Sequence, residues 1–274
     1  MNLLDDTDFL VVDVETTGLY ADSGDRVCEI GAVKLRGGAV VDTLTSLIDP
    51  RRPVSPGAYS VNRISPEMLA DAPVFEGIAE RLWSMMEDAT VVAYNARFDL
   101  SFLVSEFRLI GYPPIKNPVI DALAMARQII PGIGKYPQEN VARVLGIPFP
   151  VKHRALEDAM VTAHIFTMFT SMLKAYDCPT TDHLARRDLL QMLTARRVDI
   201  LSDALSRQRD VWMRYLSPTE IEISERIITP KELINGQFSK SAEYLIAYCH
   251  SSRSEKNFRI DRILDMRLME RDQL

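Results

Sequence analysis

The chain has 274 residues, enough for one large domain or for a domain of ordinary size with a smaller one. With 47% hydrophobic and 26% charged residues, its composition is that of a globular protein and excludes a disordered chain. The net charge of −6 lacks the basic excess of many nucleic-acid proteins, and residues 1–180 hold 16 basic against 23 acidic side chains. This acidic surplus predicts either a solvated surface or carboxylates gathered around cations.

Two further exclusions follow from simple counts. No apolar run approaches the ~20 residues that a membrane span requires, and no basic leader precedes an apolar stretch at the start of the sequence. We therefore expect a cytoplasmic protein with no membrane partner. Cys28, Cys178 and Cys249 are odd in number and far apart, which predicts buried free thiols instead of a disulfide framework or a zinc site.

Strands and helices alternate through the first two thirds of the chain. Short apolar, β-branched runs predict strands, and apolar residues at helical spacing predict helices. The strands are expected at residues 9–14, 26–35, 40–48, 90–94 and 119–121. Helices are expected from Ser65-Pro66 to about residue 85, from residue 96 to about 110, in a short stretch ending at Gly146, and over 156–174. This order predicts an α/β fold, with a mixed sheet flanked by helices.

The pattern changes after residue 174. Residues 175–182 contain Pro179 and turn-forming residues without periodicity, which indicates a linker. One or two helices are expected over 182–208, followed by short strands at 211–216, 221–228, 244–249 and 258–264. Short strands at such spacing predict a small β-barrel or sandwich.

Asp13 and Glu15 lie two residues apart near the end of the first predicted strand, so both side chains leave the same face of the sheet. A carboxylate in a mostly buried strand is costly unless it is paired with a basic residue or binds a metal. Both explanations are open for these two residues taken alone.

Four further residues stand at or just before the starts of predicted helices. Asn95 is a candidate N-cap that places Asp99 in the first helical turn, where the helix dipole also favours a negative charge. His153 and Asp158 cannot share a face if both are helical, because five residues correspond to ~500° of rotation. We therefore expect His153 in the loop before the last long helix and Asp158 in its first turn.

Asp13, Glu15, Asp99 and Asp158 form a set of oxygen ligands without cysteine, which favours magnesium or manganese over zinc. Four carboxylates in one pocket repel each other, so two divalent cations are the natural complement. A pair of such ions can stabilise both the attacking and the leaving oxygen in phosphodiester cleavage. His153 supplies a candidate general base.

Three segments resemble, in order and spacing, the motifs of the DEDDh or DnaQ-like exonuclease family, which includes the proofreading epsilon subunit of bacterial DNA polymerase III. They are VVDVETTGL (11–19), YNARFDLSFL (94–103) and HRALEDAMVTAHIF (153–166). The resemblance implies an RNase H-like fold and release of nucleoside monophosphates from a 3′ end.

The resemblance also implies a role for each motif residue. Asp13, Glu15 and Asp158 would hold the metal that activates water, Asp13 and Asp99 the metal near the leaving group, and His153 would be the base. The backbone around Thr16, Thr17, Gly18 and Leu19 would line the terminal nucleotide, with Asn95 and Phe98 beside it. The family commonly has histidine at position 94 and an apolar residue at 138. Tyr94 and Gln138 depart from that pattern and leave the substrate preference in doubt.

The C-terminal segment resembles a WYL domain, an SH3/Sm-like barrel often attached to bacterial nucleic-acid proteins. The matching features include residues 211–217, Tyr244-Leu245 and the run FRIDRI (258–263), although Glu243 stands where the family has tryptophan. The resemblance implies a nucleic-acid or nucleotide surface with Tyr244, Arg259 and Arg262 as candidates. Packing, dimerisation, or an ion pair such as Arg262 with Asp265 explains these residues equally well.

The sequence thus predicts three segments: an exonuclease domain at 1–174, a linker and helix at 175–200, and a WYL-like β domain at 201–274. The expected function is metal-dependent 3′→5′ removal of nucleotides from DNA with two Mg²⁺ or Mn²⁺ ions. A 3′→5′ exoribonuclease and a catalytically silent nucleic-acid-binding regulator are the alternatives. Expected partners are nucleic acid, namely DNA 3′ ends or RNA, and a DNA polymerase or repair proteins.

Overall fold

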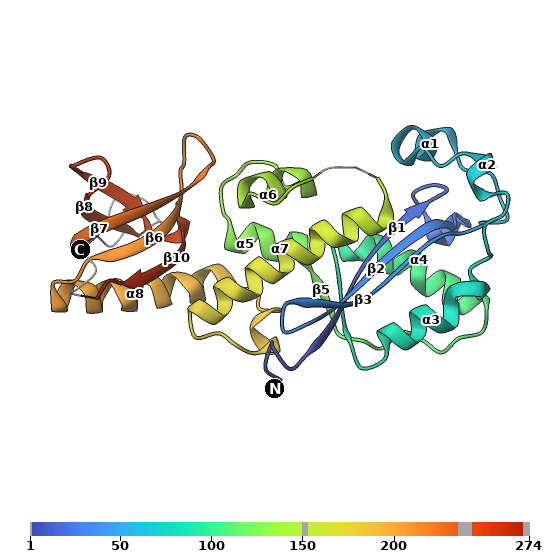
Figure 1. Ribbon diagram of the computed structural model, residues 1–274, viewed down its shortest axis with the longest axis horizontal. Helices are drawn as coiled ribbons and strands as arrows, with labels where there is room; N and C mark the ends of the chain where they lie inside the picture. Colours follow the sequence, from blue (N-terminus) through green and yellow to red (C-terminus); the bar gives the residue numbers. More distant parts are fainter. Residues whose placement is uncertain (1, 150–152, 235–242, 271–274) are drawn as a thin grey trace. The chain divides into compact units, whose positions relative to one another are not determined.

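The computed structural model describes residues 2–149, 153–234 and 243–270, and the chain forms two compact units (Figure 1). The first unit comprises Met1–Ala124 and Val141–Thr167, and the second comprises Met125–Asn140 and Met168–Leu274. Among the described residues, no helix combines the length and the apolar character needed to cross a membrane. Cys28, Cys178 and Cys249 are buried free thiols, as predicted.

The first unit is built on a five-stranded mixed sheet in the order β3-β2-β1-β4-β5. β1 pairs antiparallel with β2 and parallel with β4, while β5 is parallel to β4. The strands are β1 (Asp8–Thr16), β2 (Val27–Arg36), β3 (Ala39–Leu47), β4 (Thr90–Ala93) and β5 (Val119–Asp121). The predicted mixed sheet is confirmed.

The two faces of β1 pack against different helices. Leu10, Val12 and Val14 belong to a buried core with α3 (Glu76–Met86) and α4 (Ala96–Leu109). Phe9 points the other way, where its ring meets that of Phe166 from α7 (Ala155–Ala175) at 4.8 Å between centroids. Because strand residues alternate, Asp13 and Glu15 share the face of Phe9, the face crossed by α7 (Figure 1).

Several local predictions for the first unit are wrong or incomplete. The single helix expected from Ser65 to about residue 85 is two helices, α2 (Pro66–Leu69) and α3, separated by a segment containing Pro73. The sequence pattern also missed α1 (Pro56–Asn62), whose first turn is capped by the Ser55 hydroxyl. The remaining elements are the 3-10 turn η1 (Ala21–Ser23), α5 (Ala122–Ile129) and α6 (Gln138–Leu145).

The second unit contains a short 3-10 turn, a long helix and an antiparallel sheet in the order β10-β6-β7-β8-β9. These elements are η2 (Thr181–His183), α8 (Leu189–Arg207), β6 (Val211–Leu216), β7 (Ile223–Ile234), β8 (Tyr244–Cys249), β9 (Ser254–Arg259) and β10 (Ile263–Leu268). The single strand predicted over 258–264 is wrong, because the 3-10 turn η3 (Ile260–Arg262) separates β9 from β10. Closure of this sheet into a barrel stays a prediction.

Candidate active site

The first two acidic residues stand at the end of β1, beside the end of a parallel neighbour. Asp13 and Glu15 are among the last four residues of β1, and both are partly buried. β4 runs parallel to β1 and ends at Ala93, two residues before Asn95. Since the carboxyl ends of parallel strands open onto the same edge of a sheet, this edge is the natural place for a ligand.

Asp99 reaches that edge from the first turn of α4. Only 3% of its surface is exposed, and its Oδ1 accepts a hydrogen bond from the Val14 backbone N–H at 3.0 Å. The carboxylate therefore lies against the strand between the two acidic residues of β1. Asn95 is the N-cap residue of this helix, as predicted, with φ of 68° and no side-chain capping bond.

His153 and Asp158 meet at the start of α7. His153 lies outside the helix with φ of 59°, and its backbone N–H donates to Asp158 Oδ2 at 3.0 Å. Glu15, His153 and Asp158 each offer one ligand atom within 4.8 Å of the others. The predicted placement of His153 before the helix and Asp158 in its first turn is confirmed.

Glu29 is a fifth carboxylate beside the site, and no sequence motif indicated it as a site residue. It lies opposite Glu15 on β2 and is 3% exposed. One of its oxygens accepts the Ala155 backbone N–H at 3.2 Å, and the other pairs with the Arg154 guanidinium at 2.5 Å. Glu29 therefore fixes the first turn of α7. The signal was a single charged residue inside the apolar strand VCEIGAV, but the strand alone cannot name its partner.

Gly31 lets α7 approach β2 closely enough for these contacts. A Cβ built at Gly31 would lie 2.2 Å from the backbone carbonyl carbon of Ala155, so alanine cannot fit unless the helix moves. We expect Gly31→Ala to lower the free energy of unfolding by about 1–3 kcal/mol, the usual cost of overpacking a core. Thermal or urea unfolding followed by circular dichroism measures this loss.

Gly57→Ala is the matched control for that substitution. A Cβ at Gly57 meets nothing within 4 Å, and the residue lies in α1. The control should be neutral or slightly stabilising, because alanine is favoured over glycine in a helix. A Gly31→Ala protein as stable as the wild type would contradict the close approach of β2 and α7.

The carboxylates raise one another's pKa, and burial adds to the effect. Burial first, and then Asp99, Asp158 and Glu15, raise the pKa of Asp13 well above its ordinary value. Burial together with Asp158 and Glu29 raises the pKa of Glu15 to about 7. Burial raises the pKa of Asp99 to about 8, although the hydrogen bond from Val14 opposes the shift. These four carboxylates thus lie close enough to interact strongly.

This donor set fits divalent cations that prefer oxygen ligands. Among the described residues, the basic partner beside these groups is Arg154, and its ion pair is with Glu29. Divalent cations bound among the carboxylates would reduce the repulsion between them. With such cations bound, the arrangement would stabilise charge on a phosphate group held at this edge of the sheet.

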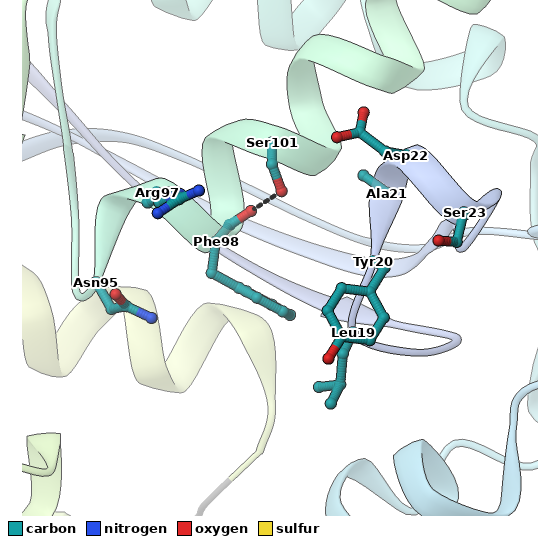
Figure 2. Close-up of a pocket in the computed structure, with 9 residues that line it drawn as sticks. All are labelled: Leu19, Tyr20, Ala21, Asp22, Ser23, Asn95, Arg97, Phe98 and Ser101. Atoms are coloured by element: carbon teal, nitrogen blue, oxygen red, sulfur yellow. Dashed lines mark hydrogen bonds between the residues drawn. The ribbon is translucent and has the colours of Figure 1, made fainter.

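The residues predicted to line a terminal nucleotide divide into two groups. Leu19, Asn95 and Phe98 border a pocket of about 420 Å³ on the surface of the first unit (Figure 2). Thr16 and Thr17 are buried, and the Thr17 hydroxyl donates to Asp25 Oδ1 at 3.2 Å. Neither threonine is among the residues that border this pocket, and the role of their backbone stays a prediction.

The predicted C-terminal residues lie near one another in the second unit. Tyr244 on β8 is opposite Arg259 on β9, and Arg259 pairs with Asp261 at 2.6 Å. Arg262 is 5% exposed, and its guanidinium donates to the Ser217 carbonyl oxygen at 3.3 Å. Arg262 thus lies in the turn η3, with its side chain buried.

Comparison with known proteins matches both parts of the chain. Residues 10–166 match the family model described as Exonuclease (RNase_T), and residues 196–268 match that of the WYL domain. The DNA polymerase III PolC-type of Thermotoga maritima is 38% identical over 170 residues, 62% of this chain and 12% of that relative. The corresponding protein of Caldanaerobacter subterraneus subsp. tengcongensis is 31% identical over 193 residues, 70% of this chain and 13% of that relative. The chain thus spans about an eighth of the length of these relatives.

Solved structures agree on the fold. Exonuclease I of E. coli, in complex with a dA16 oligonucleotide, superposes with a TM-score of 0.54 at 16% identity, covering 88% of this chain and 55% of that chain. The exonuclease model covers more than half of the chain and all three motifs. The chain therefore belongs to the exonuclease family, in its DnaQ-like branch, and carries a WYL domain in its C-terminal part.

Proposed function

We propose that the protein is a metal-dependent 3′→5′ exonuclease that releases nucleoside 5′-monophosphates from DNA ends. The convergence of four acidic side chains at the edge of the sheet carries this proposal. The carboxylates come from β1, α4 and α7, and the pKa values of Asp13, Glu15 and Asp99 are raised as expected for groups sharing one pocket. Such a pocket is suited to bind cations and a phosphodiester.

In the proposed reaction, Asp13, Glu15, Asp99 and Asp158 would hold two divalent ions. When bound, these ions supply Lewis-acid stabilisation to the attacking and leaving oxygens. His153 accepts a proton from the attacking water, whose oxygen forms a new bond to phosphorus. The bond from phosphorus to the 3′ oxygen of the next nucleotide breaks, and the terminal nucleotide leaves with its 5′ phosphate.

DNA is the proposed substrate because the relatives with 31–38% identity are named DNA polymerase III PolC-type. A replication or repair context and a polymerase partner are proposed on the same ground. We also propose an exonuclease domain at 1–174, a linker and helix at 175–200, and a WYL-like β domain at 201–274. The accessory nucleic-acid or nucleotide-binding role of Tyr244, Arg259 and Arg262 is likewise proposed.

The wild-type protein with Mg²⁺ should shorten a 5′-labelled single strand of DNA one nucleotide at a time. Gel electrophoresis of time points should show a ladder, and chromatography should identify 5′-mononucleotides. EDTA should stop the reaction. An RNA strand of the same sequence, assayed in parallel, distinguishes the exoribonuclease alternative. If DNA and RNA both stay intact after incubation with the protein and Mg²⁺ or Mn²⁺, the proposed exonuclease activity is wrong.

A further inference from the structure

The pocket bordered by Leu19, Asn95 and Phe98 has an apolar side and one basic side chain. Leu19 and Tyr20 are 68% and 67% exposed, and together with the Phe98 ring they give the pocket an apolar, partly aromatic wall (Figure 2). Of the residues that line it, Arg97 alone is basic, and Asp22 alone is acidic. Aromatic walls beside a cation suit a nucleic acid strand, because bases stack on rings and phosphates seek positive charge.

Arg97 differs from most arginines of the first unit. Arg26, Arg36, Arg51, Arg52, Arg81 and Arg154 each form an ion pair with a carboxylate. Arg97 is exposed and makes no ion pair or side-chain hydrogen bond with any residue of the described part of the chain. Its charge is therefore available to a ligand that enters the pocket.

The position of Arg97 on α4 decides which phosphate it can reach. Arg97 and Asp99 are two residues apart, about 200° around the helix, so they point in nearly opposite directions. Asp99 points inward to Val14 and the other carboxylates. Arg97 points outward, beside Asn95 and Phe98 (Figure 2). This orientation favours contact of Arg97 with a phosphate other than the one held by the carboxylates.

A strand end offers another phosphate for this arginine. The terminal nucleotide carries only one phosphate, which is the one cleaved, because its 3′ side is a free hydroxyl. The next phosphate along the strand lies on the 5′ side of the penultimate nucleotide. Resting on the proposed function, we propose that Arg97 binds this second phosphate and thereby makes the enzyme favour a strand over a lone nucleotide.

A pair of dinucleotides isolates that contact. The wild type should hydrolyse the 5′-phosphorylated thymidine dinucleotide with a kcat/KM about tenfold above that of the same dinucleotide without the 5′ phosphate. Arg97→Gln should remove this preference and leave the unphosphorylated dinucleotide unaffected. On longer single strands, the slope of log kcat/KM against log salt concentration should become shallower by about 0.7, as expected for one lost phosphate contact.

Two controls separate this contact from general effects. Lys116→Gln removes an exposed positive charge from the loop before β5, at the opposite end of that strand from the carboxylates, and should keep the preference. The 4-nitrophenyl ester of thymidine 5′-monophosphate has no second nucleotide, so Arg97→Gln should cleave it at the wild-type rate.

Three results would count against the proposal. Retention of the phosphate preference by Arg97→Gln excludes the contact, and an equal loss of activity on the 4-nitrophenyl ester assigns Arg97 a structural role. A wild-type enzyme that cleaves both dinucleotides equally also overturns the proposal, while the proposed exonuclease activity stands. If the wild type cleaves none of the substrates with Mg²⁺, the proposed function itself fails.

Discussion

Replacing Asp13 with asparagine should abolish nucleotide release, with kcat falling by about 10³-fold or more. Removing one hydrogen-bond donor from the active site of other enzymes lowers kcat by about 10²–10³-fold. The loss for Asp13→Asn should be larger, because Asp13 lies among the other carboxylates and would hold both ions. Single-turnover hydrolysis of a 5′-labelled DNA strand at saturating Mg²⁺ measures the change.

This variant should lose activity without losing its fold. Burial and four neighbouring carboxylates raise the pKa of Asp13, so its charged form is disfavoured in the folded protein. A neutral asparagine of the same shape removes that penalty, and the thermal midpoint without metal should equal or exceed that of the wild type. Mg²⁺ should raise the midpoint less than in the wild type.

Asp71→Asn serves as the control, since it removes an exposed carboxylate just after α2. It should keep both wild-type activity and wild-type stabilisation by Mg²⁺. An Asp13→Asn protein that shortens DNA at the wild-type rate would show that the carboxylate pocket is not the catalytic centre.

The sequence predicts the acidic site well because strand alternation and helix starts are local rules. Asp13 and Glu15 share a face as a consequence of the period of two, and Asp99 and Asp158 lie in first turns as their positions indicate. No local rule connects Glu29 to Arg154, which follows it by 125 residues. Their ion pair requires the close packing of β2 and α7 at Gly31, which appears only in the folded chain.

The wrong predictions also have physical causes. α1 carries proline, glycine and serine in a seven-residue stretch with little apolar periodicity, so its sequence favours a loop until Ser55 caps it. The run FRIDRI alternates like a strand, yet the chain turns at Ile260–Arg262. There the buried Arg262 side chain donates to backbone carbonyl oxygens, including that of Ser217. Alternation alone cannot reveal such a contact, because Ser217 precedes Arg262 by 45 residues.

Replacing His153 with asparagine should lower kcat by about 10²–10⁴-fold, the size expected for the loss of a general base. Asparagine tolerates the positive φ of 59° at this position better than most residues do. The bond that holds Asp158 comes from the His153 backbone N–H, so the substitution should leave the carboxylate in place. Single-turnover rates across a Mg²⁺ titration give both kcat and the metal concentration for half-maximal activity.

The metal titration distinguishes a base from a ligand. A ring nitrogen of His153 lies within 4.8 Å of carboxylate oxygens of Glu15 and Asp158, close enough for the three to share an ion. Metal coordination is therefore the competing role for this side chain. If the His153 side chain is the base, the substitution should cause a large loss of kcat and leave the metal requirement unchanged. If it is a metal ligand, the substitution should greatly increase the metal requirement, and kcat should recover at saturating metal. His164→Asn, an exposed histidine on the same helix, should change neither quantity. A His153→Asn protein with wild-type kcat and metal requirement removes the side chain from the mechanism.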